Sequence, residues 1–214
     1  MKLSSKAQHI YNQIDKQTTK LGDLRKIAKE LKKDHDLALE LWTTTEFLPR
    51  QLAILIMDSK RLNQKEIDKL DQDIQKHDYD ERIHLIDWLM ANQLSKDKKL
   101  VALIESWENC SSSLQRRVFW YYQARLRWMG NTNQSNTDYL LSSIEQHIMD
   151  ETPEVQWAMN YTAGQIGKWQ TNYRDRCIAI GETTGLYKDE VVPKNCTPSY
   201  LPEFIRIEVA KLNT

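Results

Sequence analysis

The sequence predicts an all-α protein that folds as an α-solenoid, a stack of antiparallel helix pairs. Apolar residues recur at helical spacing, as at Ile83, Ile86 and Met90, and the segment 100–107 repeats the pattern. No segment shows the alternating apolar pattern, with turns between, that predicts strands. Glycines and prolines number only six and five, and the breaks between helical segments are mostly short. Short breaks favour helical hairpins, and a stack of hairpins leaves a concave face free for a long partner.

Twelve helices are predicted, in chain order. They span residues 3–18, 22–33, 35–44, 47–58, 63–76, 79–93, 96–108, 111–129, 137–150, 153–167, 171–184 and 199–212. Start signals support this division: Asn63 lies three residues before Glu66, and Pro153 occupies a first helical position. The longest breaks are 130–136 and 187–196. We expect residues 1–214 to form a single domain, long enough to bury a substantial core.

Composition excludes several classes of protein. The chain is 40% hydrophobic, and no apolar run approaches the length needed to cross a bilayer. Its start, MKLSS, lacks the apolar segment of a secretory signal. The three cysteines, Cys110, Cys177 and Cys196, are far apart, which favours plain thiols in a reducing compartment. The five histidines show no metal-binding spacing. We therefore expect a cytoplasmic protein without a metal or another cofactor.

Positive charge is concentrated in one stretch, although the chain has 30 basic and 30 acidic residues. No acidic residue occurs between Glu108 and Asp138. The arginines in this interval are Arg116, Arg117, Arg125 and Arg127. A neutral protein with one basic patch can still bind phosphate, because the local field governs the encounter.

The same stretch, SLQRRVFWYYQARLRW at residues 113–128, has helical spacing with aromatic residues around more than half of the circumference. One interpretation is a helix packed between neighbours, whose arginine stems cover apolar surface while the guanidiniums reach water. That accounts for the aromatic residues but not for the missing acid. We therefore predict that the four arginines contact phosphate. Lys168 and Arg174 form a second basic patch, either an exposed helix start or an extension of the same phosphate track.

Several segments, in the expected order, resemble the AlkD-like DNA alkylation repair proteins, which are built from HEAT-like helical repeats. Residues 22–42, GDLRKIAKELKKDHDLALELW, resemble the front of those proteins, and SWENCSSSLQRR at 106–117 resembles their tryptophan, polar turn and LQR sequence. VQWAMNYTAGQIG at 155–167 and YRDRCIAIGETTGLYKDE at 173–190 are similar to the later helices. CTPSYLPEFI at 196–205 is similar to their C-terminal part.

The resemblance implies a solenoid of HEAT-like repeats whose concave, positively charged face embraces double-stranded DNA. Active members are glycosylases that release cationic N3- or N7-alkylpurines. In them an aspartate and two tryptophans lie against the deoxyribose of the lesion. Negative charge and ring faces stabilise the oxocarbenium-like sugar while the cationic base departs.

The resemblance carries over to this chain only in part. Arg116 matches a family arginine that grips the DNA backbone near the lesion. The later tryptophan of the site falls at Tyr161, and the arginine expected one turn further on is Gly164. Ungapped counting places the first tryptophan and the aspartate at Asp78 and Arg82, and neither residue matches.

Nearby residues offer alternatives for the missing carboxylate. A shift of one residue puts Tyr79 at the aromatic position but Ile83 at the carboxylate position. The nearby carboxylates are Asp80, Glu81 and Asp87, and the sequence does not select among them. We take Tyr161 with Asp87 or Asp80 as the catalytic candidates. The alternatives are a solvated helix start for Asp80 and a structural ion pair for Asp87.

Two functions remain open at this point. The first is a monomeric DNA-binding member of this family that engages alkylated, distorted or branched duplex DNA, with or without glycosylase activity. The second is a non-catalytic helical-repeat scaffold for another protein or for branched DNA. DNA binding through several phosphates weakens steeply with salt, which separates DNA from many protein partners.

Overall fold

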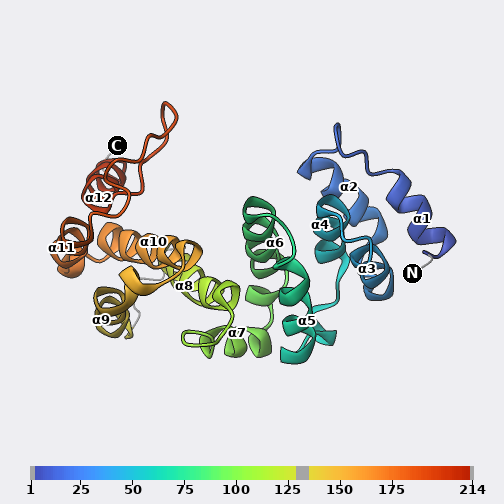
Figure 1. The fold of residues 1–214 in the computed structure, drawn as a ribbon, viewed down its shortest axis with the longest axis horizontal. Coiled ribbons are helices and arrows are strands. Elements are labelled where there is room, and N and C mark those ends of the chain that lie inside the picture. The colour runs from blue at the N-terminus through green and yellow to red at the C-terminus, as the bar shows by residue number, and fades with distance from the viewer. Residues whose placement is uncertain (1–2, 129–134, 213–214) are drawn as a thin grey trace. The chain divides into compact units, whose positions relative to one another are not determined.

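The computed structural model describes residues 3–128 and 135–212, and the regular structure in these ranges is entirely helical (Figure 1). The described chain forms two compact units, Met1–Trp107 and Glu108–Thr214, here called unit 1 and unit 2. The prediction of a single domain over residues 1–214 stays a prediction. No described helix is both long and apolar enough to span a bilayer.

Unit 1 contains seven of the α-helices and two short 3-10 helices. The α-helices are α1 (Ser5–Asn12), α2 (Leu21–Leu31), α3 (His35–Trp42), α4 (Phe47–Ile56), α5 (Gln64–Ile74), α6 (Tyr79–Asn92) and α7 (Lys98–Glu105). The 3-10 helices are η1 (Ser59–Arg61) and η2 (Leu94–Lys96).

Unit 2 contains the other five α-helices and two 3-10 helices of the described residues. They are α8 (Ser113–Trp128), α9 (Thr137–His147), α10 (Pro153–Trp169), α11 (Arg174–Thr184) and α12 (Leu201–Ala210), with η3 (Ile148–Asp150) and η4 (Thr171–Tyr173). The predicted break at 130–136 lies, except for residues 135 and 136, outside the described residues.

Alternate helices pack side by side within each unit. In unit 1, α2 packs on α4 and α4 packs on α6, while α1 packs on α3. In unit 2, α10 lies between α8 and α12 and contacts both. Contacts between every second helix are the pattern of stacked helix pairs, so the predicted all-α solenoid is confirmed.

Local signals place most helix ends where the sequence predicts them. The side chain of Asn63 accepts a hydrogen bond from the Glu66 amide at the start of α5, as the capping pattern indicates. Pro153 begins α10. The first predicted helix, 3–18, is too long, because α1 ends at Asn12. Beyond it the Asp15 carboxylate accepts from the Gln17 amide, a local turn that competes with helical hydrogen bonding.

Two glycines let α12 approach the backbone of α10. A Cβ on Gly164 would lie 2.8 Å from Cε1 of Phe204, and one on Gly167 would lie 2.5 Å from Cδ1 of Ile205. Because neither glycine carries a side chain, Phe204 and Ile205 of α12 fit directly against α10, which is continuous from Pro153 to Trp169. This close packing determines the surroundings of Tyr161.

Candidate nucleic-acid interface

Arg116, the arginine that the family resemblance singles out, lies in the first turn of α8 and is held by the carboxylate of Glu151. Its Nε and Nη2 donate to the two carboxylate oxygens of Glu151 at 2.9 and 2.8 Å, and Nη1 donates to the Cys110 carbonyl at 2.8 Å. The hydrogen bonds that Arg116 donates to Glu151 raise the pKa of Arg116 above its usual value. The side chain is 17% exposed, so its outer edge still reaches solvent.

Arg117 and Arg127 lie in the interior of unit 2, which corrects the expectation that they meet phosphate at a surface. Arg117 Nη1 donates to the Glu154 carbonyl at 2.9 Å, and its guanidinium lies 4.7 Å from the Trp157 ring. Arg127 is fully buried and donates to the Gln123 carbonyl at 3.0 Å. Burial lowers the pKa of Arg127 to about 10. α8 is packed between neighbours, as the first interpretation has it, but the guanidiniums of these two arginines bond interior carbonyls and do not reach water.

The second basic patch is also engaged within unit 2. Lys168 Nζ lies 2.8 Å from Oε2 of Glu208, and the two side chains are only 13% and 16% exposed. Arg174 donates from Nε and Nη2 to the carbonyls of Gly167 and Lys168, so it satisfies the C-terminal end of α10. These cations stabilise helix packing, and a phosphate would have to compete with partners already in place.

Arg125 differs from the other arginines of α8. It is partly exposed, and no carboxylate of the described residues forms an ion pair with it. Its guanidinium carbon lies 5.8 Å from the ring of Trp128, which is 49% exposed. Among the four arginines of this stretch, Arg125 is the one that is partly exposed beside an open aromatic ring and forms no ion pair with a described carboxylate.

Tyr161 belongs to a cluster of rings that joins α8, α10 and α12. Its ring stacks on Trp157 at 5.1 Å and 10°, and the rings of Tyr121 and Phe204 meet it edge-on at 5.8 and 6.0 Å. Burial raises the pKa of the Tyr161 hydroxyl to about 12. A cavity of about 130 Å³ adjoins the cluster and is also lined by Asn160. Neighbouring rings therefore occupy one face and much of the edge of Tyr161.

The candidate carboxylates lie on α6 in unit 1, whereas Tyr161 lies in unit 2. Asp80 is exposed in the first turn of α6, and Asp87 is half-buried two turns later. The Arg82 guanidinium lies 5.2 Å from the Tyr79 ring, and its Nε is buried without a hydrogen-bond partner in the described structure. Asp78 caps α6 by accepting from the Glu81 amide. The position that counting assigns to the family aspartate thus carries a cation.

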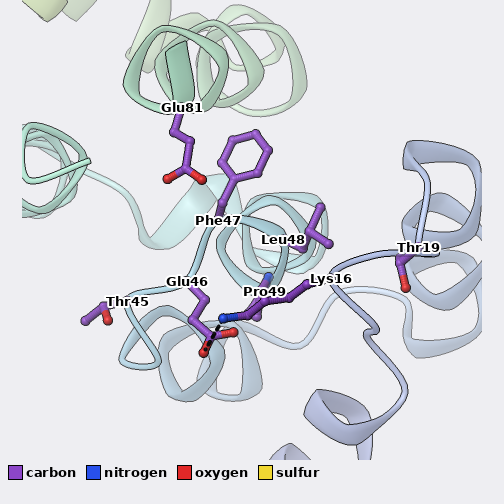
Figure 2. A pocket seen from close by; sticks show the side chains of 8 residues that line it. All are labelled: Lys16, Thr19, Thr45, Glu46, Phe47, Leu48, Pro49 and Glu81. Atoms are coloured by element: carbon purple, nitrogen blue, oxygen red, sulfur yellow. Dashed lines mark ion pairs between the residues drawn. The ribbon is translucent and has the colours of Figure 1, made fainter. Parts of the chain in front are cut away.

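Unit 1 also contains an open hollow of about 500 Å³ between the segment after α1 and the start of α4 (Figure 2). Lys16 Nζ lies 3.2 Å from Oε1 of Glu46, and the Tyr11 hydroxyl donates to the same oxygen at 2.8 Å. Figure 2 shows the Glu81 carboxylate at another side of this hollow. Two carboxylates oppose an anion here, and the lining lysine is already paired, so this hollow is a poor phosphate site. Among the described residues, no group of histidine, cysteine or carboxylate side chains is arranged to hold a metal ion.

Comparison with known proteins identifies the family. A family described as "DNA alkylation repair enzyme" matches residues 4–179. The chain belongs to this family. It is similar to a solved structure described as "A new family of proteins related to the HEAT-like repeat DNA glycosylases with affinity for branched DNA structures", with a TM-score of 0.65 and 18% sequence identity over 99% of this chain and 89% of that chain. No curated protein matches it in sequence. The HEAT-like repeat fold is confirmed.

Two features of this DNA alkylation repair family member escaped the sequence prediction. Trp157 stands four residues before Tyr161, so helical spacing alone indicates that the two rings share a face. The second feature is a cation–π contact in unit 1, in which the Arg25 guanidinium lies 5.1 Å from the Trp88 ring. These two residues are 63 positions apart, and no sequence pattern connects them.

Proposed function

We propose that the protein binds branched or distorted duplex DNA and does not excise alkylated bases. Membership in the DNA alkylation repair family supports DNA as the partner. The described affinity of its structural neighbour for branched DNA supports the preference for a distorted duplex. The stacking of Trp157 on one face of the Tyr161 ring, with Phe204 at its edge, is the observation that supports the absence of excision.

The chemistry explains why these ring contacts matter. Release of a cationic base leaves positive charge on the sugar, and an aromatic face or a carboxylate must approach that charge closely. Tyr161 already stacks on Trp157, and Phe204 occupies the space beside Gly164. On α6, Arg82 supplies a positive charge where a glycosylase of this family needs a negative one. Both departures oppose formation of an oxocarbenium-like sugar.

DNA binding requires cations that can reach phosphate. In unit 2 we propose Arg125 and the exposed edge of Arg116 for this role, and we leave out the buried Arg117 and Arg127. Phosphate contacts carry no sequence information, so alanine at Arg125 should weaken binding to all DNA sequences alike. Alanine at Arg116 is a less clear test of phosphate binding, because it also removes the internal ion pair with Glu151.

The first test is a binding assay by fluorescence anisotropy on a three-way junction, a fork and a linear duplex of shared sequence. We expect tighter binding to the branched substrates and a steep loss of affinity between about 50 and about 200 mM salt. No binding to any of these substrates at low salt would refute the proposed function and favour a protein-binding scaffold.

The second test measures release of 7-methylguanine from methylated duplex DNA by the wild-type protein. We expect no release above the spontaneous rate, because neither Tyr161, whose ring is stacked on Trp157, nor Arg82 stabilises the sugar cation. Rapid release would show that catalysis uses other residues. In that case Asp80→Asn and Asp87→Asn, assayed separately, would identify the carboxylate.

A further inference from the structure

The outward side of α8 ends in a ring and a cation that the packing of unit 2 does not use. Trp128 is 49% exposed, although a tryptophan is usually among the most buried residues on average. The Arg125 guanidinium lies 5.8 Å from its ring, within the range of a cation–π contact. In the described structure no carboxylate pairs with Arg125, whereas Arg116 is held by Glu151.

We propose that Trp128 stacks on an unpaired base at the branch point of a DNA substrate while Arg125 contacts the adjoining phosphate. This inference rests on the proposed function and deepens it, because it assigns the preference for branched DNA to one ring. An indole provides a flat surface on which any of the four bases can stack, so this contact does not depend on the DNA sequence.

The ring and the charge together favour a nucleotide over an apolar protein segment as the occupant. A nucleotide presents a flat ring and a negative charge a few ångströms apart, and the Trp128–Arg125 pair presents the matching ring and positive charge. No acidic residue occurs in the sequence between Glu108 and Asp138, so nothing within this stretch repels a phosphate. A hydrophobic partner would cover the ring but leave the guanidinium without a counter-charge.

The state of the DNA decides which base can stack. In a continuous duplex both faces of every internal base are covered by its neighbours, so an external tryptophan finds no free face. A branch point offers unpaired or terminal bases whose faces are open. Stacking by Trp128 therefore adds affinity for branched DNA and little for linear duplex, while the Arg125 charge adds to both.

Helical spacing extends this contact along unit 2. Tyr121, Arg125 and Trp128 stand at intervals of four and three, which places them on one side of α8. The Tyr121 ring in turn lies 5.7 Å from the Trp157 ring on α10. An unpaired strand that leaves Trp128 along this side would pass over the partly exposed ring of Tyr121.

The test compares Trp128→Ala with wild type on a fork that carries unpaired nucleotides and on a linear duplex of the same sequence. We expect about tenfold weaker binding to the fork and less than about twofold change on the linear duplex. Trp128→Phe keeps a ring and should recover most of the lost affinity. The matched control is Tyr139→Ala, which removes another exposed ring of unit 2 from α9 and should leave both affinities unchanged.

A fluorescence signal tests the stacking contact itself. The base analogue 2-aminopurine, placed at the unpaired position next to the branch, should be quenched by wild-type protein and by Trp128→Phe, but not by Trp128→Ala. Unchanged quenching and fork affinity in Trp128→Ala, with wild type still preferring the fork, would overturn this inference and leave the proposed function standing. A wild type that binds neither substrate would overturn both.

Discussion

The two units join their alternate helices by different means. In unit 1, Trp88 on α6 lies against the exposed Arg25 of α2 and donates from its indole nitrogen to the Gln51 carbonyl on α4 at 3.2 Å. In unit 2 the corresponding row is joined by rings. They are Tyr121 of α8, Trp157 and Tyr161 of α10, and Phe204 of α12. Alternate helices are thus joined by one tryptophan and a surface arginine in unit 1, and by a continuous aromatic cluster in unit 2.

Glycine shows the same difference. Unit 1 has one glycine, Gly22, and a Cβ there would have no neighbour within 4 Å. In unit 2, Gly164, Gly167 and Gly181 face α12 so closely that a Cβ would lie within 2.9 Å of one of its atoms. The C-terminal helix of unit 2 therefore packs against helix backbone, and that packing brings Phe204 to the edge of the Tyr161 ring.

Ion pairs complete the comparison. Lys6 and Asp34 of unit 1 are 2.6 Å apart, but their side chains are 59% and 27% exposed. The Lys168–Glu208 pair of unit 2, at 2.8 Å, is much less exposed. A shielded pair is screened less by water and salt than an exposed one. We infer that most of the basic side chains predicted to contact phosphate are instead bonded within unit 2. Few of them are therefore free to bind DNA.

The largest effect is expected from Glu208→Gln, which removes the charge that holds α12 to Lys168. Burial alone would raise the pKa of Glu208, but hydrogen bonds from Lys168, Lys211 and Thr197 lower it to about 2. Because this pKa lies below the ordinary 4.5, the ionised carboxylate stabilises the folded state above about pH 4.5. That contribution is lost as the pH falls from about 4.5 to about 2.

For Glu208→Gln we expect a loss of about 2 to 3 kcal/mol in the free energy of unfolding at neutral pH. The variant should also lose less stability than wild type on acidification through this window. Urea unfolding at neutral pH and at about pH 3 measures both. Glu203→Gln, an exposed position on the same helix, serves as the control. Equal acid sensitivity of Glu208→Gln and wild type would contradict the assigned role.

A smaller effect is expected from Gly181→Ala, which tests the close approach of the C-terminal segment. The added methyl would lie 2.6 Å from both Cβ of Leu201 and Cδ of Pro202, atoms fixed close to the backbone. We expect a loss of about 2 kcal/mol, even though alanine favours a helix over glycine by about 1 kcal/mol. Gly22→Ala in unit 1 meets no neighbour and should be neutral or stabilising. A stabilised Gly181→Ala would show that the two units do not differ in this respect.

Much of this fold follows from sequence alone, because helix starts and apolar spacing are local properties. Asn63 and Pro153 act at their own helix ends, and the predicted helices agree with the observed ones apart from shifts at the ends. The first helix was overestimated where the Asp15 side chain forms a local turn. A hydrophobic pattern does not reveal that competition.

The site was less predictable, because the use of an arginine depends on distant partners. Arg116 and Arg117 are adjacent in the sequence, yet one is held by Glu151 near the surface and the other lies under Trp157. Both partners come from segments more than thirty residues away. The missing acid around these arginines is a real signal, but their acceptors come from elsewhere: Glu151 for Arg116 and main-chain carbonyls for the buried Arg117 and Arg127. Arg125 is the partly exposed exception.

The smallest effect is expected from Arg25→Ala, which tests the exposed cation of unit 1. An exposed cation–π contact contributes about 0.5 to 1 kcal/mol, so the free energy of unfolding should fall by no more than that. Lys29→Ala, exposed on the same helix α2, controls for the loss of one positive charge. A loss well above 1 kcal/mol for Arg25→Ala would mean that this cation joins α2 to α6 as firmly as the rings join the helices of unit 2. The contrast between a surface cation and a packed aromatic cluster would then no longer hold.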